Sequence, residues 1–169
     1  ESESIDIQRY QTLYAKIRGS VAAPTAGLHF TDEVLSRIRE RGIDMENVCL
    51  HVGAGTFLPV KSQEISGHPM HREPFAVPLS LLKTIRQGDR PIVAVGTTSV
   101  RTLESLYYVG VKCIEDGKPS DVAQWDPYER EYAYSMDEAL NAIIKYLEDN
   151  NLDELKVGTR IIIVPGFKF

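Results

Sequence analysis

Cysteine is scarce in this sequence, and long apolar runs are absent. Its 169 residues include only two cysteines, Cys49 and Cys113, each beside apolar residues. Two such thiols suit reduced core cysteines better than a disulfide framework, so we expect a cytoplasmic protein. The longest apolar runs, such as Ile161–Pro165, are too short to cross a bilayer, and we expect no contact with a membrane.

The sequence also contains fewer basic than acidic residues. The chain has 19 Lys and Arg against 24 Asp and Glu, a formal net charge of −5. This balance disfavours unspecific binding to nucleic acid, which needs a basic surface, but it leaves room for a local basic site. The first residues, Glu1–Ser4, lack the positive charge and the apolar stretch of a signal peptide.

Segments with helical and strand periodicity alternate along the chain. Helices are expected after Thr31 up to Gly42, from Pro78 to Gly88, over 97–110 with Gly110 closing the helix, and from the capping box of Ser135 and Glu138. Strands are expected at 48–52, 75–77, 92–95 and 160–164. Residues 115–134 show no period and predict an inserted loop.

The alternation predicts an α/β fold, with a mostly parallel sheet covered by helices. Only three or four strands are visible, and no helix follows the last one, whereas a complete barrel of this kind needs roughly 250 residues. We therefore expect a partial, barrel-like piece of a longer protein. It would form one incomplete α/β domain over residues 1–169, with an inserted loop and helix at 115–159.

Two candidate sites combine glycine with polar side chains at the ends of expected elements, where α/β sheets place their ligands. The first is 24–30, in which His29 can act as an acid, a base or a hydrogen-bond donor. A turn with a partly buried histidine explains the same residues. The second is 51–57, in which Gly53 and Gly55 allow close approach of a ligand and Thr56 offers a hydroxyl. A plain glycine-rich turn is the alternative there.

The third candidate site, 96–105, starts a helix with three consecutive hydroxyl residues, Thr97, Thr98 and Ser99. Free amides at a helix start bind anions, and Arg101 can add a bidentate contact. Glu104 can serve as a base or accept from a hydroxyl. The alternative is an N-cap cluster with an Arg–Glu pair on the helix surface, and we favour a functional role because three hydroxyls exceed what capping requires.

Two further groups carry weaker signals. His68, His71 and Glu73 offer ligands for zinc, but the set lacks a fourth ligand and a rigid frame, so we expect no metal. Trp125 and the tyrosines after it can stack on bases, although an aromatic segment packed on itself is the preferred interpretation.

Taken in order, 24–30, 50–60, 68–73, 94–105 and 165–169 resemble successive motifs of one family, the S-adenosylmethionine:tRNA ribosyltransferase-isomerases of queuosine biosynthesis. The resemblance implies a partial barrel-like α/β domain. It also implies a separate small β-barrel domain upstream and a further Asn-Phe-His-Leu-Pro segment downstream, both absent from this sequence. Because of these absences we expect the 169-residue piece itself to be inactive.

The resemblance also implies a reaction. The ribosyl unit of S-adenosylmethionine moves onto an aminomethyl-deazaguanine in tRNA and rearranges to an epoxycyclopentane, with release of adenine and methionine. The resemblance implies that His29 and His51 are the candidates for the proton transfers. It also implies that the cofactor is anchored by Thr97, Thr98, Ser99 and Arg101. Gly53, Gly55 and Thr56 would lie along its nucleoside. S-adenosylmethionine is the co-substrate, tRNA the partner of the full-length protein, and a monomer is expected.

Two departures from the family pattern support an alternative. Leu58 stands where the family often has Arg or Gln, and 115–159 is longer than the matching segment, with a less aromatic strand at 161–164. Both favour a noncatalytic or divergent relative that binds a nucleoside or RNA on the same scaffold.

Overall fold

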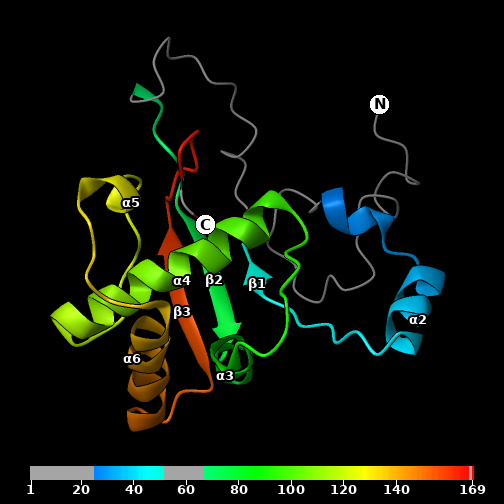
Figure 1. The fold of residues 1–169 in the computed structure, drawn as a ribbon. Helices are drawn as coiled ribbons and strands as arrows, with labels where there is room; N and C mark the ends of the chain where they lie inside the picture. The colour runs from blue at the N-terminus through cyan, green and yellow to red at the C-terminus, as the bar shows by residue number, and fades with distance from the viewer. Residues whose placement is uncertain (1–24, 52–66, 168) are drawn as a thin grey trace.

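The chain is described by a computed structural model that covers residues 25–51, 67–167 and 169. Figure 1 shows its elements along the chain. They are the 3₁₀ helix η1 (Thr25–His29), α2 (Asp32–Glu40), β1 (Cys49–Leu50), β2 (Glu73–Pro78), α3 (Leu79–Gln87), α4 (Thr97–Asp116), α5 (Asp126–Glu129), α6 (Met136–Asp149) and β3 (Glu154–Thr159).

A three-stranded sheet in the order β1-β2-β3 lies at the centre. Both pairings are antiparallel, with Leu50 opposite Phe75 and Phe75 opposite Val157. Along β2 the buried residues alternate, so Glu73, Phe75 and Val77 share the face that is turned to the core. Side chains alternate between the two faces of a strand, so this alternation places the carboxylate of Glu73 on the same face as the apolar Phe75 and Val77.

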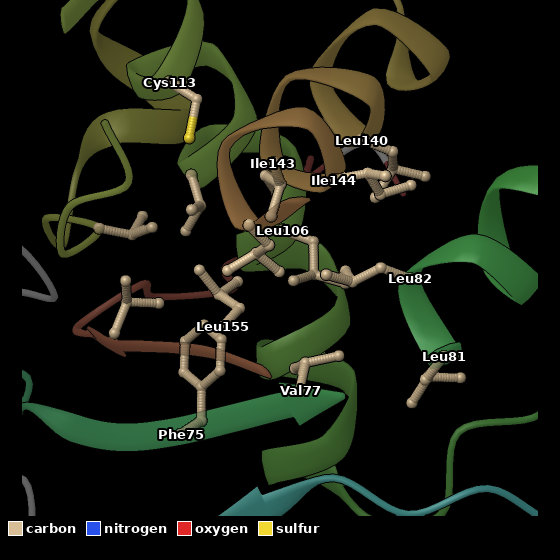
Figure 2. Close-up of a cluster of buried hydrophobic side chains, with 14 of the residues drawn as sticks. Phe75, Val77, Leu81, Leu82, Leu106, Cys113, Leu140, Ile143, Ile144 and Leu155 are labelled. Atoms are coloured by element: carbon tan, nitrogen blue, oxygen red, sulfur yellow. The ribbon is translucent and has the colours of Figure 1, made fainter. Parts of the chain in front are cut away.

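Helices α3, α4 and α6 cover that face of the sheet. The close-up in Figure 2 shows side chains from β2, β3 and these helices meeting in one apolar cluster. Its members are Phe75, Val77, Leu81, Leu82, Leu106, Val109, Cys113, Val122, Leu140, Ile143, Ile144, Leu147, Leu155, Val157 and Ile161. Burying a side chain of this size contributes about 1.5–3 kcal/mol, so this cluster is the main source of stability that the structure shows.

Gly110 sets how closely α4 and α6 approach. A Cβ atom built there would lie 2.3 Å from the backbone oxygen of Ala139, far inside contact distance. The expectation that α4 closes at Gly110 is therefore wrong, because this glycine sits inside the helix and makes room for α6. The helix ends instead at Gly117, whose φ of 75° lies in the left-handed region and whose N–H bonds to the carbonyl of Cys113.

Other local signals are confirmed. Thr31 caps α2 by accepting from the N–H of Val34, and α3 ends at Gly88 in the left-handed conformation. Ser135 and Glu138 form the expected capping box at the start of α6. Each of these signals involves residues within one helical turn, which is why the sequence alone reveals them.

The α/β class is confirmed, but the mostly parallel, barrel-like arrangement is wrong. The sheet is open and antiparallel, because β3 returns directly from α6 through Asn151 and pairs along the whole of β2. The last strand is Glu154–Thr159 and not 160–164. Leu155 and Val157 reach the core from β3, whereas Ile161 and Ile162 are buried beyond its end without joining the sheet.

The β-branched segment 92–95 also differs from the expected strand. It forms no strand in the described part of the chain, and Val93 is 84% exposed. A strand needs a neighbour for its backbone N–H and C=O groups, and among the described residues no strand pairs with this segment.

Residues 117–134, within the expected inserted loop, pack on the sheet by specific polar contacts. Asp121 accepts two hydrogen bonds from Arg72 and one from the N–H of Gly158. Lys112 pairs with Asp126 at 2.8 Å. Val122 is fully buried and forms a parallel bridge to Thr159. This segment therefore belongs to the packed body, and whether it is an insertion relative to the family stays a prediction.

Candidate functional site

The N-terminus of α4 brings two of the candidate sites together. Gly96 precedes the helix with a φ of 94°, and no side chain caps its first turn. A Cβ on Gly96 would lie 3.5 Å from the Cβ of Ala26, so η1 lies beside the residue that precedes Thr97, Thr98 and Ser99. The first-turn amides of a 20-residue helix have no acceptor within the helix, and they favour an anion at this point.

Arg101 lies one turn further along α4 and takes part in a buried polar network. Its Nη1 pairs with Glu73 at 2.7 Å and its Nε donates to the carbonyl of Ile161 at 3.0 Å. Its side chain is 12% exposed, and that of Glu73 is 5% exposed. The surface Arg–Glu pair that we considered in the sequence is thus replaced by a buried pair between α4 and β2.

The network continues from α4 into β3. The hydroxyl of Ser105 donates to Thr159 at 2.7 Å, and Thr159 accepts from the N–H of Ile161. Within the described part of the chain, the Nη2 of Arg101 is buried without a hydrogen-bond partner. One donor of this guanidinium is therefore unsatisfied among the described residues. Sequence reasoning missed Glu73, Ser105 and Thr159 as partners, although Glu73 shares the period of Phe75 and Val77.

The two candidate histidines lie on different elements. His29 ends η1 and is exposed, while His51 follows β1 and is also exposed. The N–H of His51 bonds to the carbonyl of Pro74, and its Nε2 lies 4.0 Å from the Sγ of Cys49. Since the sheet is antiparallel, the argument that parallel strands gather these histidines at one end no longer applies. Their pairing in one cleft stays a prediction, and Gly53, Gly55, Thr56 and Leu58 lie outside the described residues.

The segment considered for zinc is held by other contacts. The side chain of Gln124 bonds to the N–H of Met70 and to the carbonyl of His68, and Arg72 and Glu73 face Asp121 and Arg101. Among the described residues, no group of three or more His, Cys, Asp or Glu side chains is arranged to hold a metal ion. The absence of a metal requirement remains a prediction.

The aromatic side chains of 125–134 pack on one another and on α4. Tyr132 meets Tyr107 and Tyr108 edge to face, and Trp125 meets Tyr128 in the same way. Burial raises the pKa of Tyr108 to about 12, so its hydroxyl stays protonated at neutral pH. These contacts agree with the interpretation of an aromatic segment packed on itself.

Both cysteines are free thiols, as expected. Within the part of the chain that the structure describes, no helix is long and apolar enough to cross a membrane.

Comparison with known proteins places the chain among related sequences. Residues 2–169 match the family model described as queuosine biosynthesis protein. Three relatives carry the name S-adenosylmethionine:tRNA ribosyltransferase-isomerase. The one from Treponema denticola is 58% identical over 105 residues, or 60% of this chain and 30% of the relative. The one from Thermosipho africanus is 46% identical over 76% of this chain and 39% of the relative. The one from Thermotoga maritima is 52% identical over 60% of this chain and 31% of the relative.

The chain therefore spans about a third of the length of these curated relatives. No solved structure gives a significant match. Because the family model covers all but the first residue of the sequence, this chain belongs to the queuosine biosynthesis protein family.

Proposed function

We propose that this chain takes part in transferring the ribosyl unit of S-adenosylmethionine onto the aminomethyl-deazaguanine base of a tRNA. The unit rearranges to give epoxyqueuosine, and adenine and methionine leave. The observation that carries the proposal is the match over residues 2–169, together with the name shared by relatives that are up to 58% identical. No metal ion takes part in this proposal, and stoichiometric zinc in protein purified without added metal would contradict it.

The α4 N-terminus is the proposed anchor for the methionine carboxylate. Its free amides and the hydroxyls of Thr97, Thr98 and Ser99 supply donors, and the helix dipole favours an anion there. Arg101 adds the Nη2 donor that has no partner in the described part of the chain. Glu73 and the carbonyl of Ile161 hold the other guanidinium nitrogens, so Arg101 is already oriented before a ligand binds.

Proton transfer is assigned to His29 and His51. The sulfonium of S-adenosylmethionine acidifies the neighbouring 5′ carbon of the ribose, so a modest base suffices to remove its proton. A second group protonates adenine as it departs, the usual division between a general base and a general acid. A histidine side chain can accept a proton at one ring nitrogen and donate one from the other, and it suits either role. Gly53, Gly55 and Thr56 are the proposed neighbours of the nucleoside.

The test is release of adenine that depends on the modified tRNA. The chain is assayed alone and in a chimera in which it replaces the matching residues of the Treponema denticola relative. We expect the chimera to release adenine with tRNA that bears the aminomethyl base and not with unmodified tRNA. Binding of S-adenosylmethionine without release in an otherwise competent chimera would contradict the proposal and support a noncatalytic relative.

Two variants test the anchor. Replacing both Thr98 and Ser99 by Ala should weaken binding of S-adenosylmethionine about tenfold or more, since a hydrogen bond to a charged group contributes about 1.5–3 kcal/mol. The matched control is Thr84→Ala, which removes an exposed helical hydroxyl on α3. Arg101→Ala should weaken binding by about 1.5–3 kcal/mol on the same grounds. Unchanged affinity in the folded Arg101 variant would show that the guanidinium only holds Glu73 and Ile161.

A further inference from the structure

An apolar groove of about 370 Å³ lies where α3, α4, α6 and the segment 92–94 meet. Its volume is in the range of small-molecule sites. The side chains that shape it are Ile85, Ile92, Leu103, Met136, Leu140 and Phe169. Figure 2 labels Leu140 and Leu106, two lining residues that also belong to the core cluster. Ile92 is 57% exposed and Phe169 is 81% exposed, so the groove opens to solvent.

One carboxyl group lies among these apolar side chains. Glu104 on α4 is the only charged residue that lines the groove in the described part of the chain. Its carboxyl makes no hydrogen bond or ion pair with another described residue. Burial raises the pKa of Glu104, so its protonated form is more populated at neutral pH than in an exposed glutamate. A half-buried carboxyl without a partner among the described residues calls for a ligand that donates a hydrogen bond to it.

Glu104 and the α4 N-terminus lie on the same side of one helix. Glu104 follows Thr97 by seven positions, which is almost two full turns and a rise of about 10 Å. S-adenosylmethionine carries its carboxylate and its adenine at opposite ends of the molecule. One helix face thus offers an anion site and, two turns away, an apolar groove with a hydrogen-bonding group.

We propose that this groove binds the adenine of S-adenosylmethionine, with Glu104 as the hydrogen-bonding partner of the base. The inference rests on the proposed function, because it supplies the second end of the same ligand site. A carboxyl oxygen accepts from the exocyclic amine of the base, and when the carboxyl is protonated its O–H also donates to a ring nitrogen. The faces of the base pack against Leu103 and Met136.

The experiment measures binding of adenosine and of purine riboside, which lacks the exocyclic amine, to the 169-residue chain and its variants. The unsubstituted chain should bind adenosine about tenfold more tightly than purine riboside, the effect of about one net hydrogen bond. Glu104→Met removes the carboxyl at similar size and should abolish this preference. Glu104→Gln should retain it, because an amide also donates and accepts along the same edge of adenine. Asp116→Asn, which alters an exposed carboxyl at the far end of α4, is the control and should change nothing.

Each outcome decides the inference separately from the proposed function. Loss of the amine preference in Glu104→Met, with the preference kept in Glu104→Gln, supports the groove even if the chimera releases no adenine. An unchanged preference in a folded Glu104→Met variant overturns the groove, even if adenine release is normal. Failure of the unsubstituted chain to bind adenosine also overturns it.

Discussion

Gly110→Ala tests the closest approach between two helices in this fold. The new methyl group would lie 2.3 Å from the backbone oxygen of Ala139, and 2.5 and 2.6 Å from its carbonyl carbon and Cα. These are backbone atoms, so no side-chain rotation relieves the overlap and α6 has to move away from α4. Overpacking of this kind costs about 1–3 kcal/mol, and the better helix propensity of alanine returns up to about 1 kcal/mol.

We expect Gly110→Ala to lower the free energy of unfolding by about 2 kcal/mol. For a chain of this size, each kcal/mol lowers the melting temperature by roughly 2–4 °C, so thermal unfolding followed by circular dichroism should shift by about 4–8 °C. The matched control is Gly158→Ala. Its Cβ would meet the guanidinium of Arg72 at 2.6 Å, but this is the end of a flexible side chain that can turn aside. We expect a smaller loss there. A Gly110→Ala protein as stable as the parent, or an equal loss in Gly158→Ala, would refute this reasoning.

Three further outcomes follow from individual contacts. Ser135→Ala removes the capping box of α6 and should cost about 1 kcal/mol in urea unfolding; an unchanged midpoint would contradict the cap. The hydrogen bond from Arg72 lowers the pKa of Asp121 below 3.8. The ionised Asp121 therefore stabilises the fold above about pH 4, and this stabilisation is lost as the pH falls through the lower pKa of the folded state. Asp121→Asn should therefore flatten the stability curve over that acid range, and an unaltered curve would exclude this role. Burial raises the pKa of the Cys113 thiol to about 11, so alkylation of the native protein at neutral pH should reach the half-buried Cys49 first, and faster labelling of Cys113 would contradict its burial.

Helix boundaries set by neighbouring residues were predictable from the sequence. Thr31, Gly88 and the Ser135 capping box act within one turn, so their signals are complete without tertiary structure. Gly110 shows the limit of such signals. A glycine that ends a helix and a glycine that admits another helix look alike in a sequence, and only the position of Ala139 distinguishes them.

Strand pairing was not predictable from the same patterns. The β-branched residues of 92–95 have strand propensity, but the described sheet consists of β1, β2 and β3 and leaves that segment outside. The direction of β3 depends on its return from α6, which no local motif encodes.

The candidate site was predictable in part. The residues of 96–105 were correctly placed at a helix start, and the structure adds that Ala26 in η1 lies beside Gly96. The partner of Arg101 was not predictable, because Glu73 lies 28 residues earlier in the chain. The two side chains meet only once β2 and α4 are packed in the folded protein. The alternation of Glu73, Phe75 and Val77 was the one available signal.

The most direct test of the proposed function is the fate of the ribose carbons. The chimera with the Treponema denticola relative is given S-adenosylmethionine whose ribose is uniformly labelled with heavy carbon, together with tRNA that bears the aminomethyl base. The nucleosides of the recovered tRNA are then analysed by mass spectrometry. We expect the modified base to gain every labelled ribose carbon while the released adenine stays unlabelled. Recovery of the label in a small molecule, with the tRNA base unchanged, would contradict the proposed ribosyl transfer.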